Sequence, residues 1–315
     1  MTMMFGPIAQ VRTKETSVAT DVSLDDMQIM QIAIHDACKD AATLERVYAD
    51  YLHFFEKIGI ATNDAQAITT TILSTPWLQK SLDSIEVDIH EFLRSKTVTL
   101  SSAEGETPFL DAVRRVRQDR AERILGQIGQ YLRDIEGEII DFGTGDGRVA
   151  QKIQDVLRKK ICGVDVTAYR PVEGQTVPMS LFDGRTVKVN PKTFDAGICI
   201  NVLHHERENE KILDELDRIV KKRLVIIETV PDGDTSEEAE KDKARVFMND
   251  YLSNRIIHGA MCGADIPVPG AYDTPKGWAS RLEARGYDII VSQDLGYDQL
   301  AIRDRHHLIV ADNRN

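Results

Sequence analysis

The feature that most limits what this chain can fold into is a glycine-rich stretch, EIIDFGTGDGRVA at residues 138–150. The apolar pair Ile139-Ile140 predicts the end of a buried strand. Gly143, Gly145 and Gly147 then allow a tight turn into a helix that begins near Arg148. Because glycine has no Cβ, a ligand can lie against the backbone amides at the N-terminus of that helix. The spacing matches neither the G-x-G-x-x-G of dinucleotide-binding proteins nor a P-loop. The stretch therefore predicts a ligand-binding turn without naming the ligand.

Two patterns of apolar residues divide the chain. Residues 1–20 are polar and patternless, whereas from Ser23 to about Leu93 apolar residues recur at helical spacing without a convincing strand. This predicts a helical N-terminal region over residues 1–107, ending in a polar connector. Residues 108–315 begin with a helix and then alternate short β-branched runs with helical or loop segments, which predicts a doubly wound, mostly parallel α/β sheet. The last two runs have no helix between them and predict an antiparallel pair at one edge. The predicted strands are residues 138–142, 160–166, 194–202, 223–230, 287–294 and 306–311.

Composition narrows the class of protein and its partners. A net charge of -12 disfavours nucleic acid and anionic membranes as partners. The four cysteines, Cys38, Cys162, Cys199 and Cys262, are far apart and form no C-x-x-C pair, so they indicate neither a zinc site nor a disulfide framework. The sequence shows no signal-like segment at its start and no apolar run of transmembrane length. We therefore expect a cytoplasmic protein with reduced thiols.

Polar residues also follow the ends of three further predicted strands. Asp165 lies about twenty residues beyond the glycines, where an acidic residue can accept hydrogen bonds from a ribose diol. Asp183 is expected at the same sheet edge, within reach of an adenine amino group. The fourth strand ends at residues 201–205, again at the carboxyl edge where open α/β sheets bind ligands. Together with the glycine turn, these positions predict one nucleotide-like ligand along that edge.

From about residue 120 to its end, the chain resembles the class I S-adenosylmethionine-dependent methyltransferases, in particular their small-molecule branch. The motifs that carry the resemblance are DFGTGDG, GVD, FDG, FDAGICINVLHH and RLVIIE. The resemblance implies a Rossmann-like sheet of seven strands with an antiparallel last strand, and places the helical N-terminal region outside the shared core. The chain departs from the family after Asp183, where Val187-Lys188-Val189 replaces the usual A-x-x-L-P-F.

The resemblance implies S-adenosylmethionine as the cofactor and assigns residues to each part of it. The methionine moiety is expected near Asp141, Gly143, Gly145 and Gly147, the ribose at Asp165, the adenine near Asp183 and Gly184, and the sulfonium between Asn201 and Val202.

Methyl transfer from a sulfonium is an in-line displacement, so positioning and exclusion of water supply much of the rate. A general base is needed only where the nucleophile is protonated, as a hydroxyl is. His204 and His205 end the strand nearest the methyl group and are the candidate catalytic bases, although they can instead orient a loop or pack under the cofactor. We expect no metal site, because His306 and His307 have no local carboxylate and the cofactor needs no metal.

Residues 232–273, after the fifth strand, are too long for a simple connection and predict a helical insertion over the sheet edge. On a helix from 237 to about 258, Asp250, Asn254 and His258 form one row, and Tyr251 and Arg255 form the neighbouring row. If the helix covers the sheet edge, one row faces the acceptor, and otherwise both are solvated. The candidate substrate-binding residues are Tyr251, Asn254, Arg255 and His258.

Three functions remain open on the sequence alone. The first is methyl transfer to a small molecule, with oxygen as the preferred acceptor atom because of the nearby histidines. The second is methylation of a protein or, less in keeping with the acidic chain, of RNA. The third is a non-catalytic cofactor-binding or scaffold protein, against which the intact glycine turn and acids argue. The N-terminal helices are expected to act as a lid, as a homodimer surface, or as both.

Overall fold

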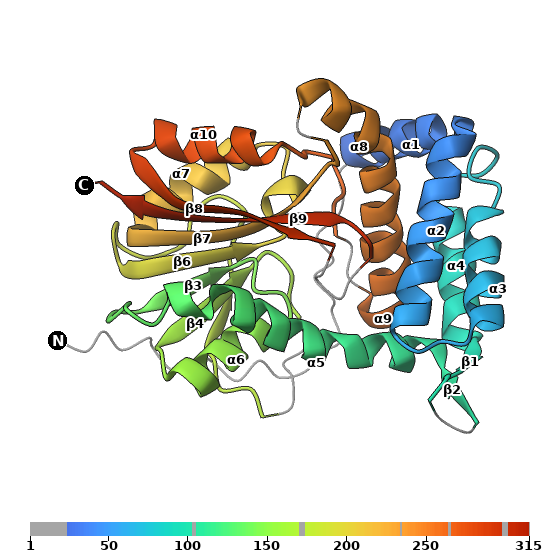
Figure 1. The fold of residues 1–315 in the computed structure, drawn as a ribbon, viewed down its shortest axis with the longest axis horizontal. Coiled ribbons are helices and arrows are strands. Elements are labelled where there is room, and N and C mark those ends of the chain that lie inside the picture. The colour runs from blue at the N-terminus through green and yellow to red at the C-terminus, as the bar shows by residue number, and fades with distance from the viewer. Residues whose placement is uncertain are drawn as a thin grey trace.

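The computed structural model describes residues 24–102, 105–169, 174–233, 235–263, 266–297 and 302–314. The patternless residues 1–20 lie outside the described residues. Figure 1 shows two regions side by side, a twisted sheet flanked by helices and a bundle of helices beyond one end of the strands. Within the described residues, no helix is long and apolar enough to cross a membrane.

The sheet has seven strands in the order β5-β4-β3-β6-β7-β9-β8. The first five strands of this order, β5, β4, β3, β6 and β7, pair in parallel, whereas β9 is antiparallel to both β7 and β8. This confirms the predicted mostly parallel Rossmann-like sheet with an antiparallel last strand. The strands are β3 (Ile139–Phe142), β4 (Ile161–Asp165), β5 (Met179–Leu181), β6 (Phe194–Ile200), β7 (Val220–Val230), β8 (Tyr287–Gly296) and β9 (Arg305–Asn313).

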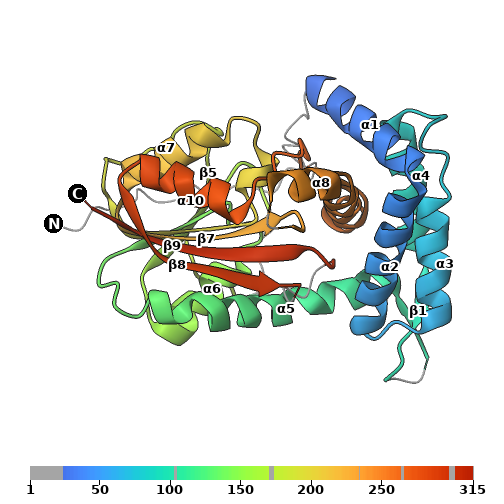
Figure 2. The ribbon, with the colours of Figure 1, turned by 45° about the horizontal axis from the view of Figure 1, so that its top comes forward.

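Helices cover both faces of the sheet, as Figure 2 shows. On one face, α5 (Phe109–Ile128) and α6 (Arg148–Leu157) share a buried apolar core with the central strands. On the other face, α7 (Asn209–Ile219) and α10 (Pro275–Ala284) share a second core. The central strands are buried on both faces, which explains why their sequences are continuous apolar runs rather than alternating ones.

The N-terminal region consists of α1 (Leu24–Lys39), α2 (Ala41–Lys57), α3 (Thr62–Leu73) and α4 (Leu82–Ser95). The prediction of a strand-free region was wrong at its end, because β1 (Thr97–Thr99) and β2 (Glu106–Pro108) pair as a short antiparallel hairpin. These strands have three residues each, too few for an alternating pattern to be visible in the sequence.

The insertion after β7 forms α8 (Ser236–Tyr251), a π-helical turn (Leu252–His258) and α9 (Gly259–Cys262), which follow one another without a break. Its apolar side chains belong to the same buried core as those of α1 to α4. In Figure 1 the insertion lies between the sheet and the N-terminal helices. The N-terminal region is thereby held against the carboxyl edge of the parallel strands.

A buried polar network also joins the two regions. The guanidinium of Arg245 on α8 pairs with Asp242 on the same helix, with Asp50 on α2 and with Asp304 just before β9. Asn249 donates hydrogen bonds to both Asp50 and Asp304, at 3.0 and 2.9 Å. A buried charge needs such partners, so this network requires α2, α8 and β9 to keep one relative position.

Candidate functional site

A cavity of about 420 Å³ lies between the carboxyl edge of the sheet and the helical insertion. Its sheet side is lined by Asp141, Gly143, Gly145, Asp165, Phe182, Gly184, Asn201 and Val202. Its other side is lined by the two histidines that follow β6 and by residues of α2, of α8, of the π-helical turn after α8 and of the loop before α10. These residues are His204, His205, Phe54, Asp250, Asn254, His258, Ile266 and Pro267.

The glycine turn has the backbone that only glycine adopts readily. Gly143, Gly145 and Gly147 have φ of 73°, 57° and 77°, in the left-handed region. A Cβ on Gly143 would lie 2.3 Å from Val202, so this position is required by packing. A Cβ on Gly145 would meet no atom within 4 Å, and because Gly145 lines the cavity, that open space is the cavity itself. Gly147 caps the start of α6 and does not line the cavity.

We expect Gly145→Ala to weaken cofactor binding about tenfold or more, because the new methyl group enters the cavity and the left-handed backbone is strained by about 1–2 kcal/mol. Gly263→Ala is the matched control, since Gly263 has φ of 68° and equally open surroundings but lies outside the cavity. Calorimetry with S-adenosylmethionine measures the loss of affinity caused by the methyl group in the cavity, and a thermal melt of each variant measures the loss of stability caused by backbone strain. Equal loss of affinity in both variants would contradict the expectation.

Asp165 ends β4 with its side chain at the cavity. Its Oδ2 accepts a hydrogen bond from the Gly145 amide at 2.8 Å and its Oδ1 accepts one from the Thr167 amide at 2.9 Å. Burial raises the pKa of this carboxyl above its ordinary value. Since a carboxylate has about four acceptor positions, Asp165 retains acceptor capacity for the hydroxyls of a ligand.

The two other predicted acids differ from each other in position. Asp141 is buried at the cavity wall, where it accepts a hydrogen bond from the Thr144 hydroxyl at 2.7 Å, and burial raises its pKa to about 7. Asp183 is exposed and does not line the cavity. Its Oδ1 accepts hydrogen bonds from the amides of Arg185 and Thr186, so in this structure Asp183 stabilises a turn while Gly184 beside it lines the cavity.

Asn201 and Val202 lie at the end of β6, on the cavity wall. Asn201 has φ of 54°, which is uncommon for a residue with a side chain. Its Oδ1 is buried and has no hydrogen-bond partner among the described residues. A buried polar atom of this kind is normally satisfied, so a ligand in the cavity is the natural partner. This atom, the open space at Gly145 and the free acceptor positions of Asp165 fit a polar nucleoside cofactor.

His204 lies in a 3₁₀ turn after β6 and is fixed by Glu228 of β7. Its Nδ1 is 2.5 Å from Glu228 Oε2, while Glu228 Oε1 accepts hydrogen bonds from the amides of Val202 and Leu203. Its Nε2 is 3.8 Å from Asp250 Oδ1. Burial disfavours a charged ring, but the two carboxylates outweigh burial and raise the pKa of His204 to about 10.

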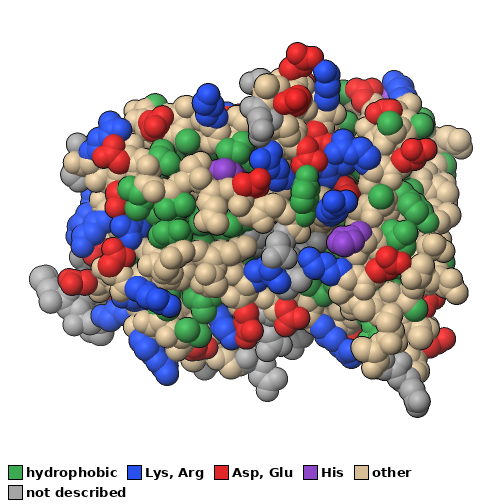
Figure 3. All heavy atoms as spheres, viewed as in Figure 1, with side chains coloured by type: hydrophobic (Ala, Val, Ile, Leu, Met, Phe, Trp, Pro, Cys, Tyr) green, Lys and Arg blue, Asp and Glu red, His purple; other side chains and the backbone are tan. Residues whose placement is uncertain are grey.

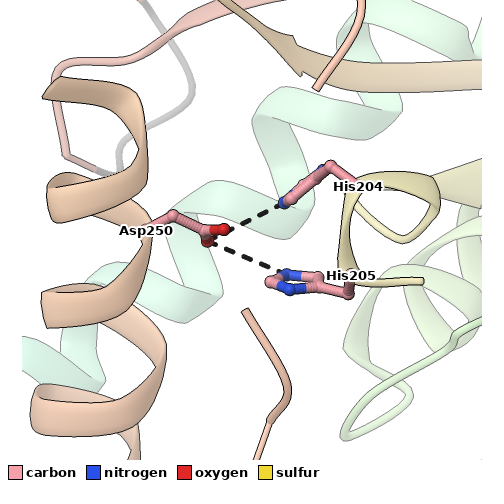
Figure 4. A group of neighbouring side chains, drawn as sticks. All are labelled: His204, His205 and Asp250. Atoms are coloured by element: carbon pink, nitrogen blue, oxygen red, sulfur yellow. Dashed lines mark ion pairs between the residues drawn. The ribbon is translucent and has the colours of Figure 1, made fainter. Parts of the chain in front are cut away.

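His205 also faces the carboxylate of Asp250, but its pKa is shifted in the opposite direction from that of His204. Its Nδ1 is 2.8 Å from the Pro267 carbonyl oxygen, so Nδ1 carries a proton to donate and Nε2 holds a lone pair. Burial, and then the charge of His204, lower the pKa of His205. Its Nε2 is 3.9 Å from Asp250 Oδ1, and Figure 4 shows both rings directed from the turn toward Asp250 on α8.

Asp250 is oriented by two further hydrogen bonds. The Tyr272 hydroxyl donates to Oδ2 and the Asn254 amide donates to Oδ1, both at 2.6 Å. Burial favours the neutral acid, but the neighbouring histidines lower its pKa to about 2. The sequence placed Asp250 in a helical row and did not single it out, because the histidines that it faces are 45 residues earlier in the chain.

The insertion presents only one of its two predicted rows to the cavity. Asp250, Asn254 and His258 line it. Tyr251 and Arg255, also predicted as substrate-binding residues, face α4 instead, where the Tyr251 hydroxyl and the Arg255 guanidinium each contact Glu86 at 2.6 Å. Both are buried, and neither lines the cavity, so we assign them to helix packing rather than to the acceptor.

Sequence reasoning missed two further residues of the cavity wall, His306 and Asp304. The Nδ1 of His306 donates to the Asp304 carbonyl oxygen at 2.8 Å, and its Nε2 lies 3.4 Å from the Asn201 amide nitrogen. Burial, and then the charge of Arg120, lower the pKa of His306 to about 3, so its ring is neutral. The sequence did contain a signal for these two residues. The last strand was predicted to be antiparallel, so its first residues lie beside the carboxyl ends of the parallel strands.

The order of the sheet, the glycine turn and the acid after β4 define a Rossmann-like methyltransferase fold. A family model described as "Methyltransferase domain" matches residues 113–292, more than half of the chain. The chain belongs to this methyltransferase family and is an S-adenosylmethionine-dependent enzyme.

The solved structures to which the chain is similar are distant in sequence. Magnesium protoporphyrin IX methyltransferase from Synechocystis PCC 6803, with bound SAH, is 14% identical over 73% of this chain and 95% of its own, with a TM-score of 0.43. The 1,6-didemethyltoxoflavin-N1-methyltransferase from Burkholderia thailandensis is 13% identical over 64% of this chain and 79% of its own, with a TM-score of 0.42. No curated protein matches the sequence. The acceptor must therefore be argued from the residues of this chain.

Proposed function

We propose that this enzyme transfers the methyl group of S-adenosylmethionine to an oxygen atom of a small-molecule acceptor. The observation that carries the proposal is one cavity lined both by the glycine turn and by His204, His205 and Asp250. Its volume of about 420 Å³ lies in the range of small-molecule sites. Side chains of α2, α5, α8 and the loop before α10 line the acceptor side, and a cavity of this size favours a metabolite over a polypeptide.

When bound, S-adenosylmethionine supplies a methyl group that is already activated by the positive charge of its sulfur. The side chain of Asp165 is assigned to the ribose hydroxyls, and Gly184 to the side of the adenine. Asp141 and the backbone of Gly143 and Gly145 are assigned to the amino-acid end, and Asn201 and Val202 to the wall beside the reacting methyl. Gly147 and Asp183 shape the turns that hold these residues.

The acceptor side suits a hydroxyl group. A hydroxyl must lose its proton as the oxygen attacks, and His205 Nε2 has the lone pair to accept it. Both ring nitrogens of His204 face carboxylates, so His204 orients the cluster and balances its charge. Asn254 and His258 extend the polar wall. The acceptor side also has apolar side chains, which favour an acceptor with apolar groups near its hydroxyl: Phe54, Val113, Val116, Ile257, Met261 and Ile266.

The distribution of charge does not favour the alternative of an RNA substrate, which would need a basic surface. Figure 3 shows Lys and Arg side chains interspersed with Asp and Glu on the face in view, and the chain as a whole is acidic.

The test is transfer of a labelled methyl group from S-adenosylmethionine into a fractionated metabolite extract. We expect label in a low-mass product whose new methyl is on oxygen by mass spectrometry and NMR. His205→Ala is expected to lower kcat by about 10²–10⁴ without changing cofactor affinity, whereas His53→Ala, an exposed histidine on α2, leaves kcat unchanged. Label found only in protein would refute the small-molecule acceptor, and full turnover by His205→Ala would remove the base assignment.

A further inference from the structure

The three side chains at the acceptor end have the geometry of a metal-binding group. The Nε2 atoms of His204 and His205 are 3.8 and 3.9 Å from Asp250 Oδ1, and all three atoms lie within 4.8 Å of one another. Two ligand atoms that each bind a zinc-like ion at about 2.0–2.2 Å are separated by at most about 4.4 Å. The two measured separations fall inside that limit, and Figure 4 shows the rings and the carboxylate converging from the turn after β6 and from α8.

The other nitrogen of each ring is held in the manner of a metal ligand. A histidine that binds a metal almost always donates its second N–H to a carboxylate or a backbone carbonyl, which fixes the tautomer and the ring orientation. His204 Nδ1 contacts Glu228 Oε2, and His205 Nδ1 contacts the Pro267 carbonyl oxygen. Both histidines therefore direct Nε2 at the same point, one supported by a carboxylate and the other by a carbonyl.

The carboxylate ligand is supported in the same way. The hydroxyl of Tyr272 and the amide of Asn254 each donate a hydrogen bond to Asp250, so its orientation is set by groups outside the cluster. The Asn254 contact and the Asp250 ligand atom both involve Oδ1, which has two acceptor positions. Asp250 can thus keep this hydrogen bond while one lone pair is directed at an ion.

The charge of the cluster also favours a cation. Glu228 and Asp250 are 1% and 6% exposed, and within the described part of the chain neither is paired with a lysine or an arginine. Buried carboxylates are costly unless a positive charge or a metal compensates them. Among the ionisable bases of the described residues, only the two histidines face these carboxylates, and a divalent cation supplies the same compensation with two neutral rings.

We propose that His204 Nε2, His205 Nε2 and Asp250 Oδ1 bind a divalent transition-metal ion of the Zn²⁺ or Fe²⁺ type. Two imidazoles and one carboxylate with the remaining positions open to the cavity form a donor set that such ions favour. Only the role of the ion rests on the proposed function: an acceptor hydroxyl bound to it has a lowered pKa, so the ion takes over the task given above to His205 Nε2.

The first test is binding of the metal alone to the full chain, with no cofactor or acceptor. After removal of metals by a chelator, Co²⁺ is added and followed by its visible absorption, and Zn²⁺ is added in a calorimeter. We expect one equivalent per chain. His205→Ala and the isosteric Asp250→Asn are expected to weaken binding by more than about 100-fold, and Glu228→Gln by about 10–100-fold.

Two controls keep the result interpretable. His53→Ala removes an exposed imidazole and should leave Co²⁺ binding unchanged. Thermal melts show whether each variant remains folded, and a folded Asp250→Asn protein that binds Co²⁺ as tightly as the parent overturns the site. Binding without any methyl transfer supports the site and counts against the proposed function alone. Full turnover by the metal-stripped enzyme overturns the role of the ion and leaves His205 as the base.

Discussion

Replacement of Arg245 by leucine is expected to lower the free energy of unfolding by about 3–5 kcal/mol. The guanidinium is 2% exposed and pairs with Asp50, Asp242 and Asp304, which lie on α2, on α8 and next to β9. Leucine fills the space but leaves the buried carboxylates of Asp50 and Asp304 without their cation and Asp242 with Arg46 alone, which is among the most costly changes a single substitution makes. Denaturant unfolding measured by circular dichroism checks the value.

Arg46→Leu is the matched control for this result. Arg46 on α2 pairs with Asp232 and Asp242, both of which Arg245 also contacts, but the side chain of Arg46 is 50% exposed. Solvent-exposed ion pairs contribute about 1 kcal/mol or less, so a small change is expected. If Arg245→Leu cost no more than Arg46→Leu, the polar network would not be what holds the helical region against the sheet.

Replacement of Asp165 by alanine is expected to raise the dissociation constant for S-adenosylmethionine by about 10- to 150-fold. A carboxylate that accepts hydrogen bonds from ribose hydroxyls contributes about 1.5–3 kcal/mol. The same substitution removes the acceptor of the Gly145 amide, so the glycine turn loses part of its support. Calorimetry measures the affinity directly.

Asp155→Ala, which removes an exposed carboxylate on α6, should bind the cofactor with unchanged affinity. S-Adenosylhomocysteine should show the same loss with Asp165→Ala, because it contains the same ribose and lacks only the methyl group and its charge. Unchanged affinity of Asp165→Ala for both ligands would show that the ribose does not lie at the end of β4.

Most of the sheet could be predicted because each central strand is a continuous apolar run whose burial on both faces leaves a mark in the sequence. Strands β1 and β2 were missed, and β5 was expected before Asp183 but without bounds. All three have three residues each and are largely exposed, so neither periodicity nor apolarity distinguishes them from loops. Strands that are long or fully buried could be predicted, whereas three-residue strands that are largely exposed could not be given bounds.

The two rows of the insertion show a different limit. Helical periodicity correctly separates Asp250, Asn254 and His258 from Tyr251 and Arg255, but it cannot say which row faces the cavity. That choice is made by the rotation of the helix about its axis, which depends on its packing against α4 and on the contacts of Tyr251 and Arg255 with Glu86.

The sequence alone predicted the cofactor, through the resemblance of its motifs to a methyltransferase family, and the edge of the sheet at which that cofactor is expected. Parallel strands carry their carboxyl ends to one edge, so residues that directly follow strands, such as Gly145 and Asp165, are brought together by local rules. Only the tertiary structure decided the chemistry of the acceptor side. His204 and His205 meet Asp250 there because burial of apolar side chains in one core with the N-terminal helices sets where the insertion lies, and no local pattern encodes that contact.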